Sequence, residues 1–253
     1  MELVHYTLDR GIATVTLDSP ENRNALSAQL VGEMTAHLAT AAGDGGVRAV
    51  VLTHTGSTFC AGADLKESAA EGGPAQGTLR MLAMLRSIVE LPKPVIARID
   101  GHVRAGGLGI VGACDIAIAG PASSFAFTEV RLGLAPAIIS LTTLGRMSER
   151  AAARYYLTGE TFAATAAAAS GLITAATQDV DAEVAAIADA LRSCSPQGLA
   201  ETKPLTTRAT LAAFEARAEE VQAQSARLFG SDEAREGMLA FLQKRPPSWT
   251  TPA

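Results

Sequence analysis

Short apolar segments alternate with helix-like segments through the first 120 residues, and this alternation restricts the possible folds more than any other feature of the chain. The apolar segments IATVTLD, RAVVLTHTG, PVIARIDG and IAIAG are predicted to be strands at residues 12–18, 48–56, 94–101 and 116–120. The intervening segments, residues 25–43, 79–91 and 106–115, are predicted to be helices. A chain that repeats strand–helix units around apolar strands is expected to adopt an α/β fold.

Two neighbouring segments complete this part of the prediction. Residues 71–78 (EGGPAQGT) are rich in glycine and are expected to form a flexible loop before the helix at 79–91. Residues 123–130 (SSFAFTEV) are a candidate fourth strand of the repeating pattern.

The last third of the chain has a different, helical pattern. Residues 161–174, 181–194 and 210–245 carry apolar residues at helical spacing, and the last segment is expected to break at Gly230, with Ser231 as the N-cap of a further helix. We therefore predict a core over residues 1–195 and a helical region over residues 196–253. The apolar stripes of these helices fit either a core or an oligomer surface.

Composition excludes several functional classes. Apolar residues make up 48% of the chain and charged residues 19%, and the net charge is −5 without any basic cluster, so nucleic acid is not expected as a partner. No signal peptide and no apolar run long enough to span a membrane is visible. The cysteines, Cys60, Cys114 and Cys194, lack metal-ligand and redox spacing, which fits a reducing cytoplasm and predicts no metal site.

Two segments of small residues follow predicted strands and lead into helices: CAGADLKE at 60–67 and AGGLG at 105–109. Helix N-termini expose unpaired N–H groups, and two of them facing one point would stabilise an oxyanion or enolate. Tight helix–sheet packing is the alternative reason for glycine and alanine at these places. Neither segment has the spacing of a phosphate-binding or dinucleotide-binding loop.

The order and spacing of several motifs resemble the crotonase superfamily, also called the enoyl-CoA hydratase/isomerase family. The matching segments are ENRNALS, FCAGADLKE, KPVIARIDGHVRAGGLGIVGACDIAIAG, FAFTEVRLGLAP, YYLTGETF, GLIT and DEAREGMLAFLQKRPPSW, which together run nearly from end to end. The resemblance implies a spiral of ββα units, a helical C-terminal trimerisation region, a homotrimer or dimer of trimers, and acyl-CoA thioester substrates. It implies no cofactor other than the coenzyme A of the substrate.

By this resemblance, the amides of Ala63 and Gly106 would form an oxyanion hole. The segment from Arg23 to Leu26, including Ala25, resembles a coenzyme A-binding loop. The segment from Ala61 to Lys66, with Asp64 and Leu65, would line the path of the adenine and pantetheine groups. Arg23 and Lys66 are equally well explained as solvated surface charges.

The resemblance also identifies the acid–base groups. Many hydratases of the family carry two glutamates, and Glu129 in FAFTEVRLG stands at the position of one. The other position, three residues after Gly106, is Gly109, which is expected to contact substrate instead. One carboxyl can suffice for a syn addition of water, because Glu129 can take a proton from water and return it to the α-carbon. Without the resemblance, Glu129 would be interpreted as a surface or salt-bridged residue.

Three activities remain open at this point. The leading hypothesis is a hydratase, and the wording of GGLGIVGACDIAIA and FAFTEVRLGLAPAIIS resembles methylglutaconyl-CoA and isohexenylglutaconyl-CoA hydratases. The alternatives are a decarboxylase or double-bond isomerase of the same fold, and a non-catalytic acyl-CoA-binding protein. Arg104 either recognises a substrate carboxylate or points outward, and His102 is expected to point outward.

Overall fold

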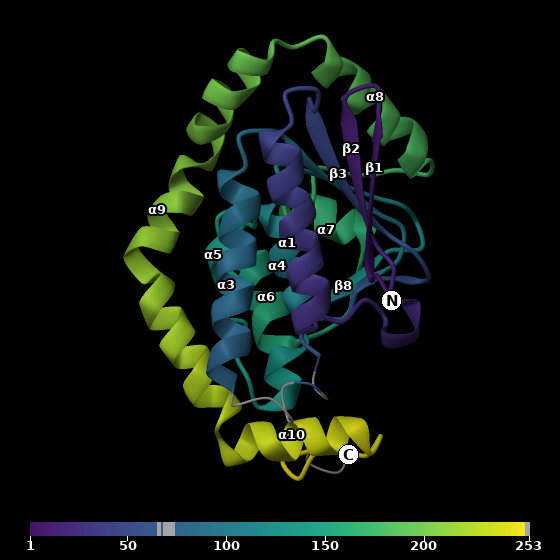
Figure 1. The fold of residues 1–253 in the computed structure, drawn as a ribbon. Helices are drawn as coiled ribbons and strands as arrows, with labels where there is room; N and C mark the ends of the chain where they lie inside the picture. Colours follow the sequence, from purple (N-terminus) through teal and green to yellow (C-terminus); the bar gives the residue numbers. More distant parts are fainter. Residues whose placement is uncertain (65–66, 68–73, 251–253) are drawn as a thin grey trace.

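The computed structural model describes residues 1–64, 67 and 74–250, and its elements form two sheets surrounded by helices (Figure 1). The larger sheet has six strands, in the spatial order β1 (Val4–Asp9), β2 (Ile12–Leu17), β3 (Ala49–His54), β5 (Val95–Ile99), β7 (Ile116–Ala119) and β10 (Ala175–Ala176). β1 pairs with β2 in antiparallel fashion, and the other pairs are parallel. The parallel pairs require crossover connections, which the helices supply.

The smaller sheet contains the strand that follows each of β3, β5 and β7 along the chain. Its order is β4 (Thr58–Cys60), β6 (His102–Arg104), β8 (Ser124–Ala126) and β9 (Phe162–Ala163), and β4, β6 and β8 are parallel. The pairs β3–β4, β5–β6 and β7–β8 therefore each place one strand in each sheet. This is the spiral of ββα units, and the α/β prediction is confirmed.

The remaining elements are helical. They are η1 (Pro20–Asn22), α1 (Ala28–Gly43), α3 (Pro74–Glu90), α4 (Gly106–Ala113), η2 (Thr128–Leu132), α5 (Ser140–Thr143), α6 (Glu149–Thr158), α7 (Ala164–Ser170), α8 (Val180–Arg192), α9 (Pro196–Phe229) and α10 (Asp232–Leu242). In Figure 1, α9 forms a long arc beside α3, and α10 lies across one end of the molecule near the C-terminus.

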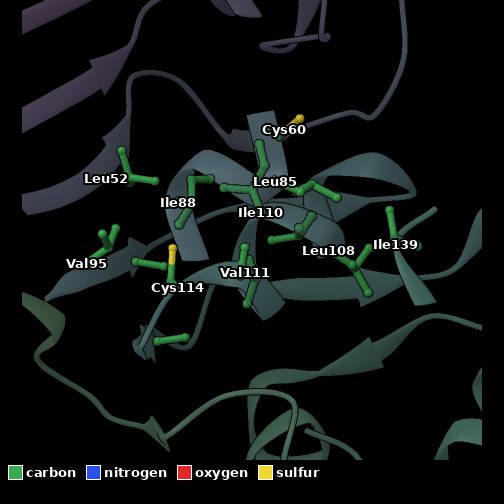
Figure 2. Close-up of a cluster of buried hydrophobic side chains, with 14 of the residues drawn as sticks. Leu52, Cys60, Leu85, Ile88, Val95, Leu108, Ile110, Val111, Cys114 and Ile139 are labelled. Carbon is green, nitrogen blue, oxygen red and sulfur yellow. The ribbon is translucent and has the colours of Figure 1, made fainter. Parts of the chain in front are cut away.

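Both faces of β3 are buried, which explains why its sequence is a continuous apolar run. Val50 and Leu52 belong to the main core, whereas Ala49 and Val51 face a second apolar cluster that includes Val184 of α8. A strand covered on both faces needs apolar residues at every position. Figure 2 shows part of the main core, where side chains of β3, α3 and α4 meet.

The C-terminal helices share this core. Phe214 and Val221 of α9 are buried in the main cluster. Lys203, also on α9, donates hydrogen bonds to the carbonyl oxygens of Ile88 and Lys93 and lies 2.9 Å from an Asp115 carboxylate oxygen. A buried cation without these partners would be strongly destabilising, so the set holds α9 in one position on the core.

Several predicted boundaries differ from the observed ones. α3 begins at Pro74, so residues 74–78 are helical and not a loop, while residues 71–73 lie outside the described part. The predicted strand at 123–130 ends at Ala126, and Thr128–Leu132 form a 3-10 helix. The break at Gly230 is confirmed, because the Ser231 side chain accepts a hydrogen bond from the Ala234 N–H.

Candidate active site

A cavity of about 530 Å³ lies between the start of α4, the 3-10 helix η2 and the C-terminal helix α10. Its walls come from segments that are far apart in the sequence: the lining residues fall within 22–31, 61–64, 77–81, 104–106, 128–139 and 225–247, and Glu67 adds to them. About two thirds of these residues are apolar, and the others are polar or charged, with five arginines among them. Such a lining is typical of a site for a small molecule with an apolar part.

Ala63 and Gly106, whose amides the family resemblance places in an oxyanion hole, both line this cavity. Within the described part of the chain, neither backbone N–H has a hydrogen-bond partner. The two turns touch, because a Cβ built on Gly62 would lie 3.2 Å from the Gly106 nitrogen. A parallel bridge between Leu26 and Ala63 holds the first turn in place. The arrangement offers two free backbone donors within one site.

Ala105, the residue before α4, has a strained backbone. Its φ is 44° and its ψ is −119°, a region that residues with a side chain rarely adopt. This turn ends β6 and starts α4 at Gly106, where the first N–H groups of the helix have no helical acceptor. A Cβ on Gly106 would lie 2.8 Å from the Met81 Cε, so glycine keeps the backbone open to the cavity.

Glu129 is the buried carboxyl of the site. It lies in the first turn of η2 and is 9% exposed. No described residue gives its Oε2 atom a hydrogen-bond partner. Burial disfavours the charged form and raises the pKa of Glu129 from its ordinary value of 4.5 to about 7. A carboxyl with such a pKa can both accept and donate a proton near neutral pH.

The loop before α1 forms another wall. Arg23, Ala25 and Ala61 line the cavity, and the Ala61 N–H donates to the Arg23 carbonyl oxygen over 3.1 Å. Asp64 also lines it and accepts a hydrogen bond from the Asn22 side chain. The predicted residues Leu65 and Lys66 lie outside the described part.

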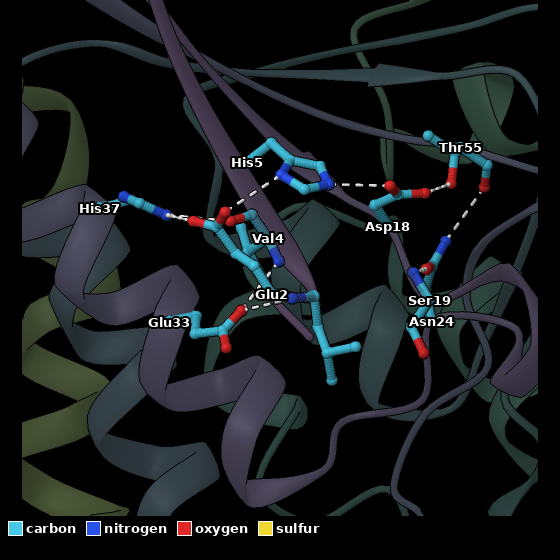
Figure 3. Close-up of polar contacts among 10 residues, drawn as sticks. Glu2, Val4, His5, Asp18, Ser19, Asn24, Glu33, His37 and Thr55 are labelled. Atoms are coloured by element: carbon cyan, nitrogen blue, oxygen red, sulfur yellow. Dashed lines mark hydrogen bonds and ion pairs between the residues drawn. The ribbon is translucent and has the colours of Figure 1, made fainter.

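Asn24 fixes the shape of this loop, a role that the sequence reasoning did not assign. Its side chain is fully buried, accepts a hydrogen bond from the Ser19 N–H and donates to the Thr55 carbonyl oxygen (Figure 3). It also donates to the Thr58 carbonyl oxygen. Its φ of 51° is one that asparagine tolerates better than most residues. The segment ENRN signals this loop, but only the fold shows which of its residues faces inward.

Gly109 does not line the cavity, although it was expected to contact substrate. A Cβ there would lie 2.6 Å from the Cγ2 atom of Ile139 and 3.2 Å from the Cδ1 atom of Leu85. Ile139 does line the cavity, so it forms the surface in front of Gly109. Sequence reasoning gave no signal for Ile139, because it is one apolar residue in an apolar run.

Arg104 and His102 belong to the small sheet. Val103 points into the core, and alternation places its two neighbours on the opposite face. The Arg104 guanidinium donates to the carbonyl oxygen and the hydroxyl of Ser124, and no carboxylate among the described residues pairs with it. Burial lowers the pKa of Arg104. Arg104 also borders the cavity, whereas His102 is exposed and contacts the Ser124 hydroxyl.

The C-terminal segment closes the cavity. Gly237, Phe241 and Arg245 are among its lining residues. A Cβ on Gly237 would lie 2.5 Å from the backbone of Leu132, so α10 packs directly on the 3-10 helix that carries Glu129. The sequence predicted α10, but nothing in its pattern indicated contact with the site.

Over residues 1–64, 67 and 74–250, no group of three or more His, Cys, Asp or Glu side chains could hold a metal ion. Within the same residues, no helix is both long and apolar enough to cross a membrane.

The fold and the site together define a crotonase-type spiral that can hold a polarised carbonyl and move a proton. A family model described as enoyl-CoA hydratase/isomerase matches residues 7–252, and the chain therefore belongs to that family. A protein from Rhodobacter capsulatus named "Probable enoyl-CoA hydratase" is 35% identical, over 98% of this chain and 97% of that protein.

Solved structures of similar proteins have the same fold. An enoyl-CoA hydratase from Mycobacterium avium superposes with a TM-score of 0.92 at 56% identity, over 98% of this chain and 99% of that chain. Another, from Mycobacterium avium subsp. paratuberculosis K-10, superposes with a TM-score of 0.88 at 27% identity, over 98% and 99% of the two chains.

Proposed function

We propose that the protein is an enoyl-CoA hydratase-type lyase that adds water across the α,β double bond of an acyl-CoA thioester, with Glu129 as its single acid–base group. One observation carries the proposal: Glu129 is buried with an unpartnered Oε2 in the same cavity as the free amides of Ala63 and Gly106. The names of the curated relatives point to the same reaction.

The reaction needs a polarised carbonyl and one proton carrier. The Ala63 and Gly106 amides donate hydrogen bonds to the carbonyl oxygen of the thioester, where negative charge develops as the enolate forms. The Glu129 carboxylate takes a proton from water while the water oxygen forms a bond to the β-carbon, and the π electrons move to the enolate. The protonated Glu129 then gives its proton to the α-carbon, which regenerates the carboxylate and completes the addition.

The coenzyme A part of the substrate is proposed to lie along the loop that bears Arg23, Ala25, Ala61 and Asp64. These four residues line the cavity that Ala63 also lines. No cofactor beyond the coenzyme A of the substrate takes part. We further propose that the protein assembles as a homotrimer or a dimer of trimers through its helical C-terminal region.

The experiment is mass analysis of the products formed from straight, branched and carboxylated enoyl-CoA thioesters. We expect a gain of one water with the native protein and its loss in Glu129→Gln, while Glu219→Gln, an exposed change on α9, keeps full activity. Loss of carbon dioxide would identify a decarboxylase. Binding of thioesters without any product would refute catalysis and assign a non-catalytic role.

A finer version of the proposal concerns a carboxylated acyl chain, as in methylglutaconyl-CoA. It is supported by Arg104, which borders the cavity and has no carboxylate partner among the described residues. Arg104→Ala should then raise KM for a glutaconyl-type thioester and spare an alkyl one of equal length. Equal effects on the two thioesters would refute this version and leave Arg104 as a partner of Ser124.

A further inference from the structure

One buried side chain, Cys60, contacts both of the turns that carry the oxyanion amides. Cys60 is the last residue of β4, is fully buried, and is not among the residues that line the cavity. Its Sγ accepts a hydrogen bond from the Gly62 N–H over 3.4 Å. A Cβ built on Gly107, in the first turn of α4, would lie 2.9 Å from the Cys60 Cβ and 2.8 Å from the Cys60 carbonyl oxygen. The start of α4 therefore packs directly against Cys60.

Hydrogen bonds on both sides of Gly62 fix the direction of the Ala63 N–H. The Gly62 N–H is bound to Cys60, and the Gly62 carbonyl oxygen accepts a hydrogen bond of 2.8 Å from the Leu26 N–H. In a trans peptide the carbonyl and the following N–H point in opposite directions, so the Ala63 N–H points away from Leu26. Gly62 has a φ of 90°, and a glycine rotates more freely than other residues, so its two peptide planes depend on these bonds for their orientation.

The position of the Gly106 amide depends on the same contacts. A Cβ built on Gly62 would lie 2.8 Å from the Ala105 Cβ and 3.2 Å from the Gly106 nitrogen, so the two turns are in direct contact. Gly107 follows Gly106 in the chain and rests on Cys60. Two donors act on one oxygen only when both lie within hydrogen-bond distance and direction of it. A change of side chain at position 60 should therefore alter how the two amides face one point.

The Cys60 thiol itself is not placed to react with a substrate. Burial raises the pKa of the Cys60 thiol to about 12, so the thiol stays protonated near neutral pH. Its sulfur can accept an N–H hydrogen bond in this neutral form. Because Cys60 does not line the cavity, it can influence a bound thioester only through the backbone that it contacts.

We propose that Cys60 is a positioning residue of the oxyanion hole, which holds the Ala63 and Gly106 amides in the directions needed to bind one carbonyl oxygen. The inference rests on the proposed function, because it concerns polarisation of the same thioester carbonyl. Cys114 supplies a matched control. It is a second buried thiol of the main core, but it lies at the C-terminal end of α4, away from Gly106 (Figure 2).

The first measurement is the rate of hydration of a 2-enoyl-CoA thioester by the full chain and by Ala and Ser variants at each of the two cysteines. We expect Cys60→Ala to lower kcat by about tenfold and to leave KM within about twofold, because the weakened hydrogen bonds matter most in the transition state. Cys60→Ser keeps an acceptor for the Gly62 N–H and should lose less. The Cys114 variants should keep kcat within about twofold. Thermal unfolding establishes that each variant is folded.

The second measurement reports carbonyl polarisation without catalysis. A conjugated dienoyl-CoA thioester absorbs at longer wavelength when strong hydrogen bonds draw electron density onto its carbonyl oxygen. Glu129→Gln prevents hydration of this probe, and the spectra are taken at saturating protein so that affinity does not contribute. The red shift on binding to Glu129→Gln should become smaller when Cys60→Ala is added. It should be unchanged when Cys114→Ala is added instead.

Two results would overturn the inference while hydration by the native protein keeps the proposed function intact. One is an equal loss of kcat in the Cys60 and Cys114 variants, and the other is a red shift that Cys60→Ala leaves unchanged. If Cys60→Ala does not fold, Cys60→Ser decides by the same two measurements. A red shift without any hydration by the native protein would refute the proposed reaction, and the comparison of red shifts would still decide the role of Cys60. Absence of both hydration and red shift refutes the two proposals together.

Discussion

Replacing Glu129 by Gln should change how the stability of the protein depends on pH. The unfolded chain releases the Glu129 proton near pH 4.5, whereas burial holds the pKa in the folded protein at about 7. Between these values the folded state binds more protons than the unfolded state, so the free energy of unfolding falls as pH rises. Well below pH 4.5 and well above pH 7, Glu129 no longer makes the free energy of unfolding depend on pH.

The size of the effect follows from the two pKa values. Each factor of ten in the ionisation constant is worth about 1.4 kcal/mol, so the native protein should lose about 3 kcal/mol between pH 4.5 and pH 7.5 that Glu129→Gln does not lose. The buried amide of Gln has its own unmet hydrogen bonds, which shift the variant's stability by a constant amount at every pH. The informative quantity is therefore the difference between the two pH curves.

Urea unfolding at one fixed protein concentration, followed by circular dichroism from pH 4.5 to pH 8, measures this difference. All other titrating groups are common to the two proteins and cancel in the comparison. If the free energies of unfolding of the two proteins ran parallel over the whole pH range, Glu129 would ionise normally despite its burial.

Other consequences can be measured on the same protein. Hydration should follow a rising pH limb with a midpoint near 7, because the Glu129 carboxylate acts as the base; a limb near pH 4.5 would contradict the pKa of about 7. Lys203→Met should destabilise the protein by about 3–5 kcal/mol in urea unfolding, because it leaves the Asp115 carboxylate without its cationic partner, and adding Asp115→Asn should recover part of the loss. Gly106→Ala should lower kcat/KM by about tenfold or more with a small change in Tm, because the new Cβ meets the side-chain ends of Met81 and Leu26 and no backbone atom; a collapse of Tm would show a structural role instead.

Much of the fold could be predicted because the relevant signals are local. The apolar segments at 48–56 and 94–101 correspond to β3 and β5, and the helix over residues 25–43 corresponds to α1, which begins slightly later, at Ala28. Periodicity and capping residues such as Ser231 are properties of neighbouring residues, so they can be seen without the fold.

The second strand of each unit was harder to predict from the residues themselves. β4 spans only Thr58–Cys60 and β6 only His102–Arg104, which is too short for alternation to be visible. β4 is stabilised by pairing with β6, and β6 by pairing with β4 and β8, and these pairs join residues distant in the sequence. The start of α3 was missed because Gly77 favours a loop locally, whereas packing against α9 favours a helix.

The sequence by itself determined the α/β class, the small residues at Ala63 and Gly106, and the single glutamate at position 129. These are matters of residue type and order. Only the tertiary structure decided that Glu129 is buried with an Oε2 atom that no described residue contacts by a hydrogen bond, that Ile139 fills the space beside Gly109, and that α10 closes the cavity. Burial, pKa and access of water depend on which distant side chains meet, and those contacts are fixed when the two sheets and the C-terminal helices pack together.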